Sequence, residues 1–180
     1  TLRQLAVPFV GLERSDSVGA AWHGRDDSVH LHTIRWLSGL PGFSIPRRFG
    51  RWVARDDLIE YLAAYADRFG IRPDFEVEAS RVERDASGWR VHTTSGTRSG
   101  SAVVVATGYT RTPYLPNWPG RDSFTGTLMH SADYRQPSPH VGTQVLVVGA
   151  GNSAAEIALE FADVGCQVDL SVRTPPNIVR

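Results

Sequence analysis

The feature that most constrains this chain is an apolar run that leads straight into a glycine-rich turn and a helix-like segment, VLVVGAGNSAAEIALEFA. Residues 144–148 have the composition of a buried strand, and residues 153–164 repeat their apolar positions at helical spacing. Residues 167–172 form a second strand-like run. This order of strand, helix and strand predicts a βαβ unit with a parallel sheet.

The turn of this unit has the spacing G-x-G-x-x-A, which is typical of sites that bind a dinucleotide. Gly149 permits the tight turn, Gly151 lets a pyrophosphate approach the backbone, and Ala154 lets helix and strand pack closely. The first amides of the helix favour an anion, and Asn152 and Ser153 add polar groups beside it. A tight turn of small residues without a ligand is the alternative.

The residue at the end of the second strand distinguishes between the two nicotinamide cofactors. NAD enzymes usually carry an acidic residue there for the ribose hydroxyl, whereas an Arg accommodates the 2′-phosphate of NADPH. Arg173 lies at this position, and the rival Asp169 falls earlier, within the strand. We therefore predict NADPH.

A second dinucleotide unit is indicated at the start of the chain. Residues 8–13, PFVGLE, form a short apolar run that ends in Glu13, as the second strand of such a unit does. Its glycine loop would lie about 20 residues upstream, before Thr1. Because the chain also opens without Met and ends just after a strand, we expect a piece of a longer protein. The alternative for Glu13 is an exposed carboxylate at a strand end.

Between these units, the sequence predicts one long helix and three strands. Residues 55–69 repeat apolar side chains at helical spacing, and Gly70 follows where a helix C-cap belongs. Residues 75–84 and 89–94 are strand-like, and the turn sequence DASG between them predicts a hairpin. The apolar residues 102–106 predict the third strand.

Composition restricts the class of protein and of partner. Nineteen basic and nineteen acidic residues cancel, so no broad electrostatic field attracts nucleic acid or a membrane surface. No apolar run approaches the roughly 20 residues that span a bilayer, and the first residues are not those of a secretory signal. Cys166 is the single cysteine, which excludes a dithiol pair in this chain and favours a reducing, cytoplasmic location.

The middle of the chain carries a more specific pattern. Residues 109–120 hold three prolines and predict a connector between two lobes. The segment VVVATGYTRTPYLPNWPG joins a strand to an A-T-G turn, and FTGTLMHSADY matches F-x-G-x-x-x-H-x-x-x-Y. In these segments, and in their order before the second glycine motif, the chain resembles the flavin-containing monooxygenases. The fixed positions of the pattern are Phe124, Gly126, His130 and Tyr134.

Three further segments are similar to the plant auxin-biosynthetic branch of that family and its bacterial relatives. They are SVHLHTIRWLSGLPGFSIP, ARDDLIEYLAAYADRFGI and VLVVGAGNSAAEIALEFA. Members of that branch oxidise indole-3-pyruvate to indole-3-acetate. The resemblance covers about residues 8–173.

The resemblance implies an α/β flavoprotein with two Rossmann-like dinucleotide-binding domains, one for FAD and one for NADPH, both incomplete in this chain. Residues 1–120 would form part of the FAD domain, without its first strand and glycine loop. Residues 121–142 would form a linker that carries the pattern, and residues 143–180 the first part of the NADPH domain.

The resemblance also implies a monooxygenase, an oxidoreductase in which NADPH reduces FAD and O2 forms a C4a-(hydro)peroxyflavin. One oxygen atom would pass to a small organic substrate, either a 2-oxo acid such as indole-3-pyruvate or a soft nitrogen or sulfur nucleophile. No acid, base or nucleophile is required of the protein, because the cofactor performs the difficult chemistry.

The family pattern implies the residues that would bind the cofactors. The flavin side would comprise Glu13, Arg14, Gly19, Trp22, Thr107 and Gly108, and the NADPH side Gly149, Gly151, Asn152, Ser153, Ala154 and Arg173. Where the family usually has two adjacent glycines, this chain has Gly19 followed by Ala20. His32 aligns with an active-site Asn of many animal-type members, and we carry no catalytic role onto it.

Several side chains have two interpretations. We interpret His130 as a residue that positions the linker rather than as a general base. His30 and His32 lack a carboxylate or cysteine at metal-binding spacing, so we expect no metal site. Three tryptophans have two interpretations, an aromatic pocket for an indole ring or plain packing in the core. They are Trp22, Trp36 and Trp52.

Two other functions stay open. A Baeyer–Villiger monooxygenase is the nearest enzymatic rival. The chain on its own would be an inactive cofactor-binding fragment, colourless or pale when purified, because it lacks the first glycine loop. A homodimer is a candidate assembly, and the other expected partners are O2 and the small-molecule substrate.

Overall fold

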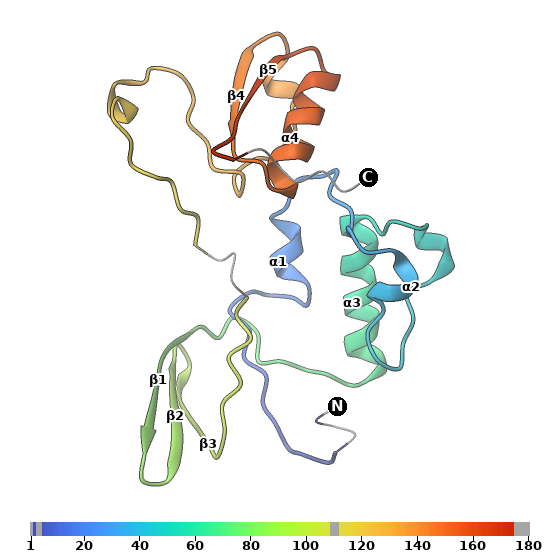
Figure 1. Cartoon of the computed structure of the whole chain (residues 1–180). Coiled ribbons are helices and arrows are strands. Elements are labelled where there is room, and N and C mark those ends of the chain that lie inside the picture. Colours follow the sequence, from blue (N-terminus) through green and yellow to red (C-terminus); the bar gives the residue numbers. More distant parts are fainter. Residues whose placement is uncertain (1, 3–4, 109–111, 175–180) are drawn as a thin grey trace. The chain divides into compact units, whose positions relative to one another are not determined.

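The structure is a computed structural model, which describes residues 2, 5–108 and 112–174 (Figure 1). Its contacts group the chain into two compact units. Unit 1 comprises residues 1–24 and 29–111, and unit 2 comprises residues 25–28 and 112–180. The domain limits at residues 120 and 142 stay a prediction, and residues 109–111 of the predicted connector lie outside the described residues.

Unit 1 contains the predicted long helix, α3, which spans Arg55–Arg68. Two acidic residues lie in its first turn, where negative charge is favourable. Gly70 follows the C-cap residue Phe69 and has a φ of +58°, a conformation that glycine adopts without strain. Buried side chains of α3 pack with the segment that precedes it in one core cluster, formed by Ile45, Phe49, Val53, Leu58 and Tyr61.

Two short helices, α1 (Ala20–His23) and α2 (Arg35–Ser38), lie in the same unit, and α1 contacts α3. A single 3-10 turn spans Arg47–Phe49. The buried hydroxyl of Tyr61 fixes the loop after α2, because it donates to the carbonyl of Phe43 at 2.5 Å and accepts the amide of Leu40 at 2.7 Å.

Unit 1 also contains an antiparallel sheet of β1 (Ala79–Asp85), β2 (Gly88–Thr93) and β3 (Gly96–Gly100), in that order. The predicted hairpin is confirmed as β1 and β2, although β1 begins only at Ala79. β3 was not predicted. Its residues, GTRSG, lack the branched and aromatic side chains that favour strands, and they are exposed.

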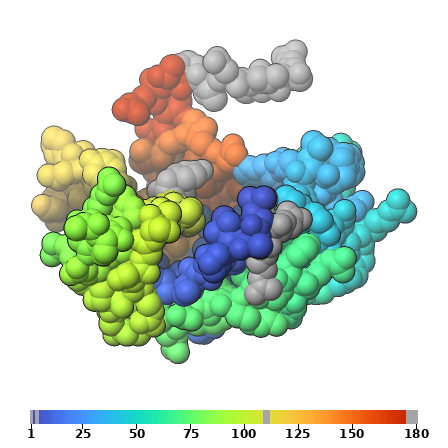
Figure 2. Space-filling model, turned by 90° about the horizontal axis from the view of Figure 1, so that it is seen from below, coloured from blue at the N-terminus to red at the C-terminus, as the bar shows by residue number. Residues whose placement is uncertain are grey.

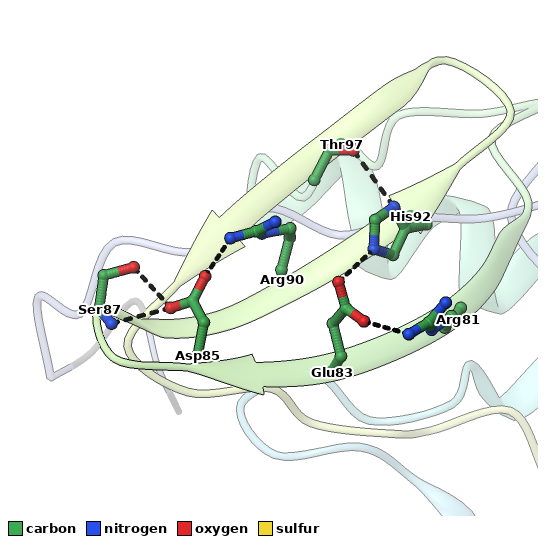
Figure 3. Close-up of polar contacts among 7 residues, drawn as sticks. All are labelled: Arg81, Glu83, Asp85, Ser87, Arg90, His92 and Thr97. Carbon is green, nitrogen blue, oxygen red and sulfur yellow. Dashed lines mark hydrogen bonds and ion pairs between the residues drawn. The ribbon is translucent and has the colours of Figure 1, made fainter.

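One face of this sheet carries linked polar contacts (Figure 3). His92 Nε2 lies 2.8 Å from Glu83 Oε1, and this hydrogen bond is the main cause that lowers the pKa of Glu83. Asp85 accepts the hydroxyl of Ser87 at 2.6 Å, the amide of Ser87 at 2.8 Å, and a guanidinium N–H of Arg90. These bonds lower the pKa of Asp85 from its ordinary value of 3.8 to about 2.

Two predicted strands do not form. Residues 102–106 lie outside any strand, and Val104 and Val105 are 80% and 73% exposed. Residues 8–13 form no strand, and Leu12 makes an isolated parallel bridge to Asp74. Figure 2 shows the neighbouring residues 5–10, in dark blue, on the surface of unit 1. Apolar composition makes a segment suited to a strand, but the strand forms only beside a partner that takes its hydrogen bonds.

Unit 2 contains the predicted βαβ unit as β4 (Gln144–Val148), α4 (Asn152–Asp163) and β5 (Gln167–Ser171) (Figure 1). β4 and β5 pair in parallel, with Val148 opposite Ser171. α4 packs on one face of this sheet around a buried cluster of Tyr134, Ile157, Phe161 and Cys166. Two 3-10 turns precede β4, at Arg121–Ser123 and Ser138–His140. No helix in the described part of the chain is long and apolar enough to cross a membrane.

Candidate functional site

The strongest candidate site lies at the carboxyl edge of the β4–β5 sheet. Because the two strands are parallel, the residues that follow them meet at one edge. The amide of Gly149 donates to the carbonyl of Ser171 at 2.9 Å and extends the ladder past the end of β4. We call residues 149–154 together with Arg173 the glycine edge.

The two glycines of this edge meet different requirements. Gly149 has a φ of +124°, and a Cβ built there would lie 3.9 Å from the Cβ of Ala154, so the protein's own backbone requires glycine. Gly151 has an ordinary φ of −79°, and a Cβ there would meet nothing within 4 Å. The fold therefore does not need glycine at 151, whereas a pyrophosphate that approaches the backbone does.

The start of α4 can accept an anion. Gly151 is the N-cap residue and has no side chain to cap the helix, and the first intrahelical bond runs from the amide of Ala155 to Gly151 at 3.0 Å. The amides of the first turn precede that bond, and the helix dipole adds partial positive charge there. Asn152 and Ser153 are exposed at this end. The residues present fit a pyrophosphate.

The residue that would select the nicotinamide cofactor also lies at this edge. Asp169 sits inside β5, opposite Leu146, and is not at the strand end. Arg173 follows the end of β5 by two residues, and its side chain is exposed. The structure therefore brings the six predicted NADPH-side residues to a single edge.

The first residues predicted for the flavin side are held by long-range backbone pairing. The amide of Glu13 donates to Asp74 at 3.0 Å, and its carbonyl accepts the amide of Val77 at 2.9 Å. Its carboxylate accepts the amide of Ser15 at 2.9 Å, so it shapes the local turn. Arg14 is exposed beside it.

Gly19 and Trp22 lie around α1. Gly19 has a φ of +81°, and a Cβ there would lie 3.6 to 3.7 Å from Leu62 and Ile59 of α3. Ala20 begins the helix, where a Cβ fits the backbone conformation. We call Glu13, Arg14, Gly19 and Trp22 the N-terminal group.

A cavity of about 280 Å³ in unit 1 adjoins this group. Trp22 and His32 contribute to its wall, together with apolar side chains of Leu31, Leu58 and Leu62. Thr107 and Gly108, the other two predicted flavin-side residues, are exposed and do not line this cavity. Trp36 and Trp52 do not line it either, and each instead lies within 6.0 Å of the guanidinium of Arg51.

The fixed positions of the F-x-G-x-x-x-H-x-x-x-Y pattern have structural roles here. The ring of Phe124 covers Gly126 so closely that a Cβ at 126 would lie 2.5 Å from Cζ of the ring. His130 Nδ1 accepts the amide of Ala132 at 3.0 Å, which shapes a turn. This contact agrees with a positioning role for His130.

Tyr134 is 3% exposed, and its hydroxyl donates to Glu160 of α4 at 2.6 Å. Burial, followed by this bond to a carboxylate, raises the pKa of Tyr134 well above its ordinary value. Glu160 was not predicted as a functional residue. Its signal was an acid in the apolar stripe of the helix, between Ile157 and Val164. Among the described residues, no group of His, Cys, Asp and Glu is arranged to hold a metal ion.

Comparison with known proteins assigns this geometry to a family. Residues 41–178, more than half of the chain, match the family described as pyridine nucleotide-disulphide oxidoreductase. The chain belongs to this family. Residues 1–180 contain one thiol, that of Cys166, which is buried and donates to the carbonyl of His140 at 3.0 Å.

The relatives of this chain include named monooxygenases. Probable indole-3-pyruvate monooxygenase YUCCA4 from Arabidopsis thaliana is 35% identical over 99% of this chain and 44% of its own length. A flavin-containing monooxygenase from Stenotrophomonas maltophilia has a TM-score of 0.85 at 29% identity, over 95% of this chain and 51% of its own. A cyclohexanone monooxygenase with bound ε-caprolactone has a TM-score of 0.73 at 26% identity, over 97% and 36%.

The chain thus spans about half the length, or less, of the relatives that it matches. These similarities confirm the predicted α/β flavoprotein fold class and the resemblance to the flavin-containing monooxygenases. They also bear out the predicted cofactor pair, FAD and NADPH, at the level of this family.

Proposed function

We propose that the full-length protein is an FAD-dependent monooxygenase that uses NADPH and O2 to insert one oxygen atom into a small organic substrate. The observation that carries this proposal is Gly151, where the packing of the protein does not require glycine but a pyrophosphate does. The identity of 35% to an indole-3-pyruvate monooxygenase supports oxygenation rather than another flavin reaction.

In this proposal the glycine edge holds the nicotinamide cofactor. The amides at the start of α4 bind the pyrophosphate, with Asn152 and Ser153 beside it, while Gly149 and Ala154 keep turn and helix close. The guanidinium of Arg173 binds the 2′-phosphate through charge-assisted hydrogen bonds. The exposure of Arg173 supports this role, because the side chain is accessible to a ligand.

The residues of unit 1 hold the flavin in the same proposal. Glu13 and Arg14 bind the adenosine end, Gly19 and Trp22 lie along the flavin, and Thr107 and Gly108 contact it from the A-T-G turn. When bound, the two cofactors supply the redox chemistry that activates O2. The mostly apolar wall of the cavity beside Trp22 serves to exclude water from the reacting groups.

We propose a 2-oxo acid such as indole-3-pyruvate as substrate, with a soft nitrogen or sulfur nucleophile as the second choice. The name of the relative YUCCA4 supports the 2-oxo acid. His32 in the cavity wall offers a polar group that orients a carboxylate, and the neighbouring leucines suit an aromatic ring.

The test is an assay of the full-length protein, saturated with FAD, under ¹⁸O₂. With indole-3-pyruvate and NADPH we expect indole-3-acetate that carries one ¹⁸O atom, together with one NADPH oxidised for each product. NADPH oxidation that yields only hydrogen peroxide with every substrate class would refute oxygenation. NADH in place of NADPH is the matched control for cofactor selection.

A Baeyer–Villiger monooxygenase is the second candidate, supported by the likeness to cyclohexanone monooxygenase. The same assay with cyclic ketones separates the two, because this activity yields a lactone. The third candidate is an inactive cofactor-binding fragment, for which residues 1–180 alone would purify colourless or pale and bind little flavin.

We include a cytoplasmic location and a homodimer in this proposal. Cell fractionation tests the location, and light scattering of the full-length protein tests the assembly. A monomer at micromolar concentration would remove the homodimer and leave the catalytic proposal unaffected.

A further inference from the structure

Glu160 of α4 binds two hydroxyl groups that come from distant parts of the sequence. Tyr134 donates to Oε2 of Glu160 at 2.6 Å, and Ser28 donates to Oε1. Ser28 is 132 residues away from Glu160 along the chain. One carboxylate therefore joins α4 both to the end of the F-x-G-x-x-x-H-x-x-x-Y pattern and to the N-terminal part of the chain.

Ser28 lies in a segment that belongs to unit 2 although both of its neighbours belong to unit 1. Residues 25–28 group with unit 2, whereas residues 1–24 and 29–111 form unit 1. A second bond holds this crossing segment, since the amide of Asp27 donates to the carbonyl of Arg135 at 3.3 Å. Both Asp27 and Ser28 thus attach the crossing segment to unit 2.

The crossing segment is short, and cavity-lining residues flank it on both sides. Trp22 lies three residues before Arg25, and Leu31 lies three residues after Ser28. Three residues of extended chain span at most about 10 Å, which limits how far the crossing segment can move without moving Trp22 or Leu31.

The hydroxyl of Ser28 has two carboxylates within reach. The Ser28 hydroxyl also lies 3.0 Å from a carboxylate oxygen of Asp26, in its own segment. A serine hydroxyl has one proton, so a full hydrogen bond to Asp26 replaces the one to Glu160. Exchange of one carboxylate acceptor for the other keeps the proton of Ser28 in a hydrogen bond.

We propose that Glu160 and Ser28 are positioning residues, which transmit the binding of nucleotide at the start of α4 to Trp22 and His32 in the cavity of unit 1. Glu160 lies on the same rigid helix as Ser153, roughly 10 Å further along its axis at 1.5 Å per residue. A shift of α4 toward a bound pyrophosphate therefore moves the Glu160 carboxylate and the crossing segment with it. This inference rests on the proposed function, because it needs NADPH at the glycine edge.

The first test measures amide hydrogen exchange of the full-length protein with and without NADP⁺. In the wild type we expect NADP⁺ to slow exchange in residues 20–33, which lie outside the glycine edge. In Ser28→Ala that protection is lost, and in Ser28→Thr, which keeps a hydroxyl, it returns. Ser87→Ala is the matched control, because Ser87 also donates to a carboxylate at the surface but lies in the β1–β2 hairpin.

The second test separates positioning from stability. We expect Ser28→Ala to lower the limiting rate of flavin reduction at saturating NADPH at least about fivefold, the lower end of ordinary couplings between sites. The Kd for NADP⁺ changes less than twofold and the melting temperature is unchanged. Glu160→Ala reproduces the loss, whereas Glu160→Gln largely restores the rate, since its amide can still bond both hydroxyls.

Two results would overturn the inference. One is NADP⁺ binding to the wild type without protection of residues 20–33, and the other is Ser28→Ala with wild-type exchange and rate. A protein that binds NADP⁺ and protects residues 20–33 but forms no oxygenated product would remove the monooxygenase proposal and leave the coupling standing. A wild type that does not bind NADP⁺ would remove both.

Discussion

The glycine edge and the N-terminal group are both predicted cofactor sites, yet the chain assembles them in different ways. The glycine edge belongs to one continuous βαβ unit, in which hydrogen bonds between β4 and β5 fix the turn. The N-terminal group depends on Asp74 and on α3, which come much later in the sequence. A local unit thus carries its own site, whereas a site made from distant segments requires the whole unit to fold first.

The largest effect should follow from Gly149→Ala, compared with Gly151→Ala. At Gly149 the positive φ makes any side chain strained, at a cost of at least about 1–2 kcal/mol of unfolding free energy, and NADP⁺ binding is lost with the turn. At Gly151 we expect an unchanged melting temperature but a Kd for NADP⁺ at least about tenfold higher, because only the ligand meets the new Cβ.

Thermal melting and calorimetric titration of NADP⁺ check this pair. Gly39→Ala is the control, since Gly39 lies in unit 1, has a φ of −68°, and a Cβ there makes only ordinary contacts. Equal loss of stability in the Gly149 and Gly151 variants would mean that both glycines serve the fold, and the comparison would lose its basis.

The next largest effect should be on the preference for NADPH over NADH. We expect Arg173→Ser to reduce the preference for NADPH over NADH about tenfold, through loss of the charge-assisted bond to the 2′-phosphate. Steady-state kinetics with both cofactors measure this preference. The KM for NADH serves as an internal control and should not rise. An unchanged preference would mean that another residue selects the cofactor, and Asp169 would be the first to test.

The N-terminal group should respond more weakly to a single change. Glu13→Gln keeps an oxygen that accepts the amide of Ser15, so the local turn survives. We expect FAD to bind about fivefold more weakly in the full-length protein, because a neutral amide is a poorer acceptor for the ribose hydroxyls. Fluorescence titration of the apoprotein with FAD measures this Kd. A wild-type affinity in the variant would mean that Glu13 only shapes the turn.

The smallest effect concerns the sheet of β1 to β3, away from both sites. Asp85 has a pKa lowered to about 2, so its contribution to stability is present above its ordinary pKa of 3.8 and is lost as the pH falls from there through about 2. We expect Asp85→Asn to exchange hairpin amides slightly faster than the wild type at pH 7 and equally below pH 2. Protection factors of the hairpin amides across this pH range test the prediction. A difference between the two proteins that persists at low pH would mean that the charge of Asp85 is not the source of the stabilisation.

The sequence predicted the elements whose signals are local. The limits of α3, β4, α4 and β5 came out within one residue, because apolar spacing and a following glycine mark them directly. The predictions that failed concern strands, because a strand forms only where a second strand can pair with it. Residues 102–106 have the composition of a central strand but lie outside any strand, while the exposed residues of β3 form a strand because β2 offers an unpaired edge.

The candidate site likewise has a part that local sequence predicts and a part that depends on distant residues. Motif spacing was enough to place the glycine edge, because the turn, the helix start and Arg173 follow one another along the chain. It was not enough to find the contact of Glu160 with Ser28 and Tyr134, since nothing in a run of residues marks a bond across 132 positions. The cavity beside Trp22 and His32 likewise depends on Tyr61, whose hydroxyl fixes the loop after α2.

The close contact of Phe124 with Gly126 makes these two positions one steric unit, although one residue separates them in the sequence. Because Phe124 is 60% exposed, its ring can turn aside, so a side chain at 126 is accommodated once the ring at 124 has left its present position. A search that scores the two letters of the pattern as independent matches therefore counts one contact twice.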